Sequence, residues 1–153
     1  MIANDILPIA NSILDVIPVN HPYLIAAKTA LKAAEGVAKS IDKAVNKRDE
    51  LEEKAEQARN DALDLEEAAL DYKSAAKDRS LPSATKQSLL KKAEEAKKRI
   101  AAKKAEAKRL DQAAKAEGKK IAQLEKQEAD AKKKADAAKI KLEQEAKKIK
   151  QQR

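Results

Sequence analysis

A seven-residue repeat of small apolar side chains runs through most of this chain. In residues 37–76, one row takes every seventh residue from Val37 to Tyr72, and a second row, four residues later, runs from Ile41 to Ala76. Such a repeat places its members on one stripe of an α-helix, where they pack against another helix as in a coiled coil. Because a stripe of this kind is not stable alone in water, the repeat predicts a long helix with a helical partner.

The repeat starts again after residue 86, in rows that begin at Leu89 and Ala93. Alanine is the most frequent residue in the rows, so the expected seam between the helices is Ala-rich. The larger seam residues are Ile41, Leu51, Leu65, Tyr72, Leu89, Ile100, Leu110, Ile121, Leu124 and Leu142. A few leucines outside the rows offer a second, partial apolar stripe, and they are Leu31, Leu63, Leu70 and Leu90.

Between the two runs lies "DRSLPSATK", residues 78–86, which either kinks a single rod or folds the chain back on itself. Leu81 precedes Pro82 and is therefore disfavoured in α-helical geometry. Breaks of this length commonly join antiparallel helices, and the rows change phase across the break, whereas a kinked rod would keep one phase. We therefore predict an antiparallel hairpin, with a helix over 22–79, a turn over 80–84 and a helix over 85–153.

The distribution of charge also favours the hairpin. Residues 49–71 contain ten acidic and two basic residues, and residues 93–115, which lie opposite in such a fold, contain eight basic and four acidic residues. Each exposed ion pair contributes only about 0.2 to 1 kcal/mol, so the charges favour the pairing without dominating it.

Composition indicates an all-α protein without a large core. Charged residues make up 39% of the chain and aromatic residues 1%. Disorder is the alternative that such a composition raises, but the regular repeat and the abundance of Ala, Lys, Glu and Leu favour helices. Because each alanine removes little apolar area from water, a single hairpin is expected to be marginally stable and the protein to be oligomeric.

The first 20 residues, "MIANDILPIANSILDVIPVN", form a separate apolar segment. We predict a short amphipathic helix here, interrupted by Pro8 and ended by Pro18. Its apolar side is formed by Ile2, Ile6, Ile9, Ile13 and Ile17. These isoleucines are the expected contacts with other copies of the chain or with a partner helix. Membrane contact is the alternative, although the polar side is acidic where membrane-surface helices are usually basic.

Residue types that carry catalysis are scarce. The chain has no Cys, and its single His, His21, precedes Pro22; either Asn20 or His21 is expected to cap the helix that follows. Carboxylate pairs at helical spacing, such as Glu52 and Glu56, lack the Glu-x-x-His pattern of di-metal sites. We therefore expect no enzymatic activity, no cofactor and no metal site.

The second predicted helix is basic, with 23 Lys and Arg against 11 Asp and Glu in residues 86–153. Such a surface can neutralise the phosphates of nucleic acid or anionic lipid. The expected contacts are Lys97, Lys98, Arg99, Lys103, Lys104, Lys132, Lys133 and Lys134. Without aromatic side chains for stacking on bases, nucleic-acid contact would be non-specific. The alternative is that the acidic first helix neutralises much of this charge.

The run "AEEAKK…AAKKAEAKR" resembles in composition the Ala-Lys-Glu spacer of Tol-type envelope proteins and the helical internal or tail-associated proteins of bacterial viruses. The resemblance covers only the helical part and includes no diagnostic motif, and the membrane anchor that opens Tol-type proteins has no counterpart in the first 20 residues. It implies an elongated helical part of a larger assembly.

Together these observations predict a non-enzymatic structural or assembly protein. It would be a self-associating hairpin within a virion, tail or injection apparatus, in contact with other proteins of that assembly, and its N-terminal segment would dock to them or meet a membrane. Polyanion binding through the basic helix is the alternative function. No stretch approaches the roughly 18 apolar residues of a spanning helix, and no basic signal-peptide region precedes the apolar residues. The expected location is the cytoplasm or an assembled particle.

Overall fold

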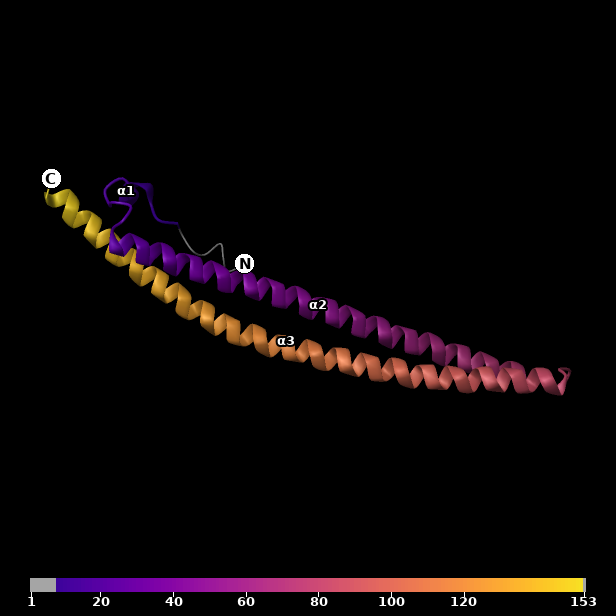
Figure 1. The fold of residues 1–153 in the computed structure, drawn as a ribbon. Coiled ribbons are helices and arrows are strands. Elements are labelled where there is room, and N and C mark those ends of the chain that lie inside the picture. Colours follow the sequence, from indigo (N-terminus) through magenta and orange to yellow (C-terminus); the bar gives the residue numbers. More distant parts are fainter. Residues whose placement is uncertain (1–7, 153) are drawn as a thin grey trace. The chain divides into compact units, whose positions relative to one another are not determined.

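The computed structural model describes residues 8–152, in which all regular structure is helical. A short helix α1 (Asn11–Leu14) precedes two long helices, α2 (Pro22–Ala76) and α3 (Ser83–Gln152). Helices α2 and α3 pack antiparallel as a hairpin (Figure 1). The predicted all-α hairpin is confirmed, and the alternative of a single kinked rod is excluded.

The chain forms two compact units, which we describe separately. The terminal unit consists of Met1–Val45 and Gly118–Arg153, and the turn unit consists of Asn46–Glu117. Each unit therefore contains one stretch of α2 and one stretch of α3.

Helix α2 begins at a histidine cap. The Tyr23 N–H donates to His21 Nδ1 at 3.1 Å, and the Ile25 N–H donates to the His21 carbonyl oxygen at 3.1 Å. Pro22 fits the first helical position because its missing N–H would have no intrahelical partner there. Of the two predicted caps, Asn20 and His21, the structure shows His21 in this role. The other ring nitrogen, Nε2, lies 3.7 Å from Glu145 Oε1 on α3.

The turn between the long helices is wider than the predicted 80–84, because α2 ends at Ala76 and α3 begins at Ser83. Asp78 stops the first helix: its Oδ1 accepts hydrogen bonds from the Ser80 N–H (2.9 Å) and the Ser80 hydroxyl (2.7 Å). A side chain that bonds the backbone two residues ahead closes a turn and competes with helix. The Pro82 carbonyl accepts the Lys86 N–H at 3.1 Å, so helical bonding resumes from Pro82.

The N-terminal segment contains only one short helix within the described residues. Between Pro8 and Pro18, the amphipathic helix that we predicted is limited to α1 and a following turn, in which the Ile17 N–H donates to the Ile13 carbonyl oxygen at 3.0 Å. Pro8 and Pro18 restrict the helix from both sides, and so few residues cannot offset the cost of helix nucleation. Ile2 and Ile6 lie outside the described residues.

Both rows of the seven-residue repeat face the seam between α2 and α3, and none of their members is exposed. Of the larger seam residues, Ile41, Ile121 and Leu142 are buried. The half-buried ones are Leu51, Leu65, Tyr72, Leu89, Ile100, Leu110 and Leu124. In the turn unit the fully buried apolar residues are all alanines, namely Ala55, Ala58, Ala62, Ala69, Ala93, Ala96, Ala107 and Ala114.

Candidate interaction surfaces

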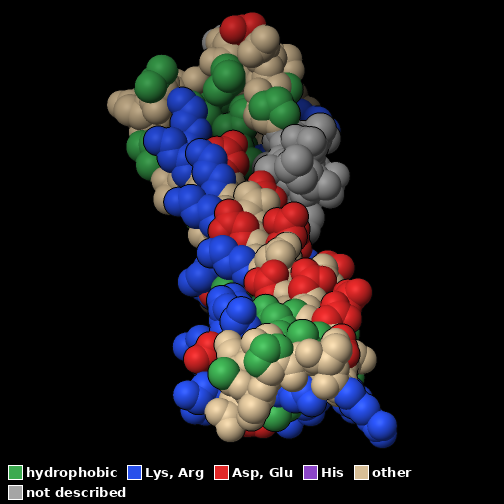
Figure 2. Space-filling model, turned by 90° about the vertical axis from the view of Figure 1, so that its right-hand side faces the viewer, with side chains coloured by type: hydrophobic (Ala, Val, Ile, Leu, Met, Phe, Trp, Pro, Cys, Tyr) green, Lys and Arg blue, Asp and Glu red, His purple; other side chains and the backbone are tan. Residues whose placement is uncertain are grey.

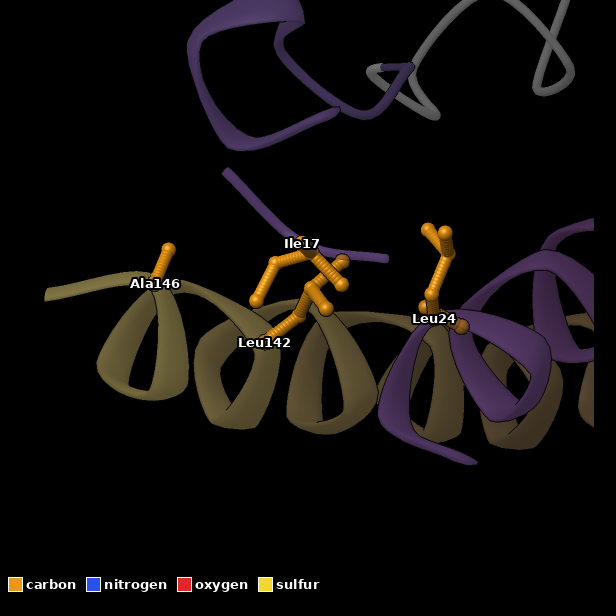
Figure 3. Packing of buried hydrophobic residues seen from close by; sticks show 5 residues of the cluster. Ile17, Leu24, Leu142 and Ala146 are labelled. Atoms are coloured by element: carbon orange, nitrogen blue, oxygen red, sulfur yellow. The ribbon is translucent and has the colours of Figure 1, made fainter. Parts of the chain in front are cut away.

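An apolar cluster fills the end of the terminal unit. It combines Ile17 with Leu24 and Ala27 of α2 and with Leu142 and Ala146 of α3. Figure 3 shows the Ile17 side chain directed at Leu142. Partly buried side chains pack around the cluster, and they are Ile9, Ile13, Ala138 and Ile149. Three of the five isoleucines predicted to contact partners, Ile9, Ile13 and Ile17, therefore contact this chain's own helices.

Other apolar side chains of the N-terminal region remain exposed. Leu14, Val19, Tyr23 and Ile25 all lie on the surface of the terminal unit, and Val19 is 82% exposed. Sequence reasoning named the isoleucines, and not these residues, as the expected partner contacts. They are the residues of this segment that a partner can reach.

A second apolar surface lies in the turn unit, beside the seam. Leu63 and Leu70 of α2, seven residues apart, are 61% and 67% exposed. They line two adjacent hollows between α2 and α3, the larger with a volume of about 570 Å³. The apolar residues of these hollows, which we call the leucine groove, are Ala62, Leu63, Ala69, Leu70, Ile100 and Ala107. Of the four leucines of the expected partial stripe, Leu63 and Leu70 thus lie at this groove, whereas Leu90 lines another hollow and Leu31 is half-buried in the terminal unit.

Charged pairs form the rim of the leucine groove. Arg59 Nη1 lies 2.8 Å from Asp111 Oδ2, and Lys104 Nζ lies 2.9 Å from Glu66 Oε1. Both pairs join α2 to α3, and all four residues line the hollow that contains Leu63. The rim therefore holds the two helices at a fixed register beside the exposed leucines.

One end of the groove is basic. Lys73 and Lys97 line the hollow that contains Leu70, and they face each other across the two helices. The Lys97 ammonium beside it lowers the pKa of Lys73. The pKa of Lys97 is raised, because its ammonium donates a hydrogen bond to the Lys73 amine and is attracted to Glu94, 3.6 Å away. Two lysine side chains thus meet at this end of the groove.

The other end of the groove is acidic. A further hollow shares Arg59 and Asp111 with the leucine groove. Its remaining lining residues are Asp49, Glu52, Glu53 and Glu56. Figure 2, a view from the turn end, shows acidic side chains gathered on one side, Lys and Arg on the other, and apolar side chains exposed between them.

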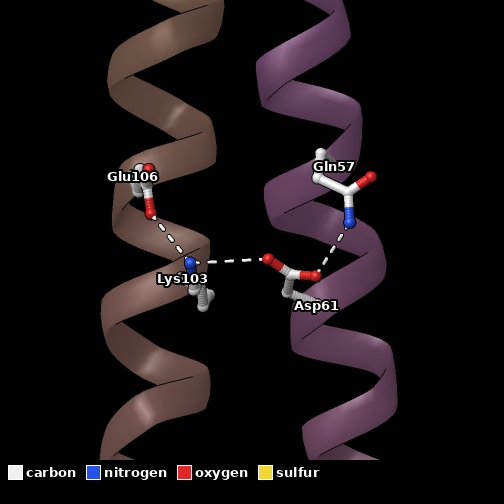
Figure 4. A network of polar contacts seen from close by, with 4 residues as sticks. All are labelled: Gln57, Asp61, Lys103 and Glu106. Carbon is white, nitrogen blue, oxygen red and sulfur yellow. Dashed lines mark hydrogen bonds and ion pairs between the residues drawn. The ribbon is translucent and has the colours of Figure 1, made fainter.

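The seam itself carries a polar network. Lys103 Nζ lies 3.4 Å from Asp61 Oδ2 on α2 and 3.5 Å from Glu106 Oε2 on its own helix (Figure 4). Gln57 Nε2 donates to the other carboxylate oxygen of Asp61 at 2.9 Å. Lys103 interrupts the seven-residue rows, and this network shows how the seam accommodates its charge.

In the ion pairs between the two long helices, the acidic residue lies on α2 in some pairs and on α3 in others. Asp61–Lys103 and Glu66–Lys104 follow the predicted direction, with the acid on α2. Lys47–Glu117, at 3.2 Å, and Arg59–Asp111 have the acid on α3. The net charges of the two stretches are therefore only partly matched across the seam, and acidic residues such as Glu52 and Glu56 remain exposed.

The residues predicted to contact polyanions fall into two groups. Lys97, Lys103 and Lys104 are in ion pairs with carboxylates of this chain. The exposed ones outside these pairs are Lys98, Arg99, Lys133 and Lys134, whereas Lys132 is half-buried. Residues 97–104 belong to the turn unit, whereas residues 132–134 belong to the terminal unit.

In the part of the chain that the structure describes, no three His, Asp or Glu side chains are arranged to hold a metal ion. None of the helices within residues 8–152 combines the length and the apolar character needed to cross a membrane. Comparison of the chain with protein-family models, curated proteins and solved structures gives no match.

Proposed function

We propose that this protein is a non-enzymatic structural or assembly component, a helical hairpin that associates with copies of itself within a larger complex. The observation that carries the proposal is the pair of exposed leucines, Leu63 and Leu70, in a groove beside a seam whose fully buried apolar residues are alanines. A seam of small side chains buries little apolar area, so covering the leucines adds stability that the single hairpin lacks.

Sedimentation velocity of the full chain tests this proposal. We expect a species larger than a monomer at tens of micromolar protein, dissociating on dilution. Replacing both leucines, Leu63→Glu with Leu70→Glu, should give a helical monomer at the same concentration. Ile140→Glu is the matched control, because Ile140 is exposed to a similar extent (54%) in the other unit. A wild-type chain that is monomeric throughout this range would contradict the proposal.

The N-terminal region supplies the docking element of the proposed function. Its exposed apolar residues, among them Val19 and Ile25, suit a partner protein of the same assembly. A protein partner is favoured over anionic lipid because the first Lys or Arg of the chain is Lys28, so this region offers no cations to a membrane. Leakage of anionic vesicles tests this choice. If the wild-type chain releases the vesicle contents and the double variant Val19→Ser, Ile25→Ser does not, the result would favour membrane contact instead.

Polyanion binding through α3 is the second candidate, and the exposed Lys98 and Arg99 favour it. Such binding should weaken steeply with salt, because it depends on the release of counterions from phosphates. A nucleic-acid mobility shift at two salt concentrations tests it, with Lys98→Glu and Arg99→Glu as variants. No shift at the lower salt concentration would contradict it.

A further inference from the structure

We propose that the leucine groove is the contact between two copies of the chain, which pack antiparallel about a two-fold axis passing between Leu63 and Leu70. This inference rests on the proposed self-association and assigns it a surface, a partner and an orientation. It derives from the order of charges along the groove.

The exposed surface of α2 beside the groove follows its own seven-residue row. Asp49, Glu56, Leu63 and Leu70 are each seven residues apart, so they share one stripe of α2, and Lys77 continues this spacing directly after the helix ends at Ala76. All five are exposed. The stripe is acidic at its start, apolar in its middle and basic at its end.

A two-fold axis through the middle of this stripe makes it complementary to itself. In such an interface each residue meets one that lies equally far from the axis on the other copy. Leu63 then packs against Leu70 of the second copy, and Glu56 faces Lys77. A parallel arrangement would instead place Glu56 against Glu56 and Lys77 against Lys77, which like-charge repulsion disfavours.

Helix α3 carries the same complementarity. Lys97 and Asp111 line opposite ends of the groove, so the same axis brings Lys97 of each copy towards Asp111 of the other. At the basic end, Lys97 lies beside Lys73 and lowers its pKa, so protonation of both lysines is disfavoured within one chain. The acidic groups that the second copy brings to this end would favour the protonated form of both. Both helices of the turn unit therefore favour one orientation.

Charge reversal tests the pairing of Glu56 with Lys77. Glu56→Lys or Lys77→Glu alone places like charges opposite each other, and each should raise the dissociation constant about tenfold. The double variant, Glu56→Lys with Lys77→Glu, exchanges the two charges and should restore the wild-type constant. Asp64→Lys, on a different side of the same helix, is the control for a change in net charge. Circular dichroism of each variant checks that the helices are intact.

The outcomes separate this inference from the proposed function. A wild-type chain that never self-associates overturns both. If the chain self-associates, two results would overturn only the assignment of this surface. One is that each single reversal self-associates no more weakly than Asp64→Lys, and the other is that the double variant self-associates more weakly than either single variant.

Spin labels test the orientation independently, since the native chain has no cysteine to compete with introduced ones. A label at Glu67→Cys lies near the axis and should be close to its copy in the second chain. A label at Glu50→Cys should be about 50 Å from its copy, because 1.5 Å of rise per residue accumulates on both sides of the axis. Short distances at both positions would indicate parallel packing and overturn the antiparallel arrangement.

Discussion

The terminal unit and the turn unit share one seven-residue repeat but bury different side chains. The terminal unit encloses large residues, including Leu24 (1% exposed) and Leu142 (0%), whereas alanines are the fully buried apolar residues of the turn unit. Full burial of a leucine contributes about 1.5–3 kcal/mol, against roughly 0.8 kcal/mol for one CH₂ group. The same pattern in sequence thus gives one unit with fully buried leucines and one whose leucines are half-buried or exposed.

This difference explains where association has most to add. In the turn unit, Leu63 and Leu70 are exposed beside the seam, so a second chain can bury what the hairpin does not. In the terminal unit, Ile17 of the N-terminal segment already covers Leu24 and Leu142. The N-terminal segment thus covers apolar side chains of the terminal unit, and we propose that a second copy of the chain covers those of the turn unit.

The largest expected effect is the loss of a core leucine in the terminal unit. Leu142→Ala should lower the free energy of unfolding by about 2–5 kcal/mol, because Leu142 is fully buried among large neighbours. Ile140→Ala, two residues away and 54% exposed, should change it by about 0.5 kcal/mol or less. Urea denaturation followed by circular dichroism measures both. Similar losses for the two variants would show that the cluster is not a packed core.

A smaller loss is expected from enlarging the alanine seam of the turn unit. Ala55→Leu should cost about 1–3 kcal/mol, because Ala55 is fully buried where the two helices meet and the extra methyl groups force them apart. The exposed Ala113 provides the matched control, and Ala113→Leu should be close to neutral. If Ala55→Leu instead stabilised the protein, the seam would contain unfilled space.

The ion pairs of the turn unit should contribute less again. A double-mutant cycle on Asp61 and Lys103, each replaced by Ala, should give a coupling of about 0.2–1 kcal/mol, because both side chains are partly exposed. The coupling should shrink as salt is added. A coupling that is both larger than this and independent of salt would indicate that the pair is shielded from solvent.

The smallest effect is expected at the turn and depends on pH. The hydrogen bonds from Ser80 lower the pKa of Asp78 below its usual value of 3.8. Ionised Asp78 therefore stabilises the turn at pH values above the ordinary pKa, and this contribution is lost as the pH falls through the lowered pKa. Amide exchange at Ser80 should be faster in Asp78→Asn than in wild type at neutral pH, and the difference should vanish in strong acid. A difference that persists in acid would contradict this assignment.

Much of the fold follows from periodicity. The seven-residue rows and the change of phase around Pro82 predict the hairpin, and the preference of Pro22 for the first helical turn predicts a cap at Asn20 or His21, of which His21 is found. The end of α2 was placed three residues too late, because the bonds from Asp78 to Ser80 depend on local turn chemistry that periodicity does not reveal.

The surfaces were harder to predict. A helical wheel shows that Ile9, Ile13 and Ile17 share one side, but it cannot show whether that side meets another chain or, as found, the same chain. The sequence also shows that Leu63 and Leu70 belong to a second apolar stripe. It does not show that these leucines lie at a groove with one acidic and one basic end, because that depends on the register of α2 against α3.

Hydrogen exchange of the native chain over a range of protein concentrations tests most directly the claim that the turn unit depends on a second copy. We predict that amide protection in residues 49–77 and 97–111 rises with concentration, while protection in residues 22–45 and 118–152 stays constant. Protection that is independent of concentration throughout the chain, or that rises only in the terminal unit, would contradict the account.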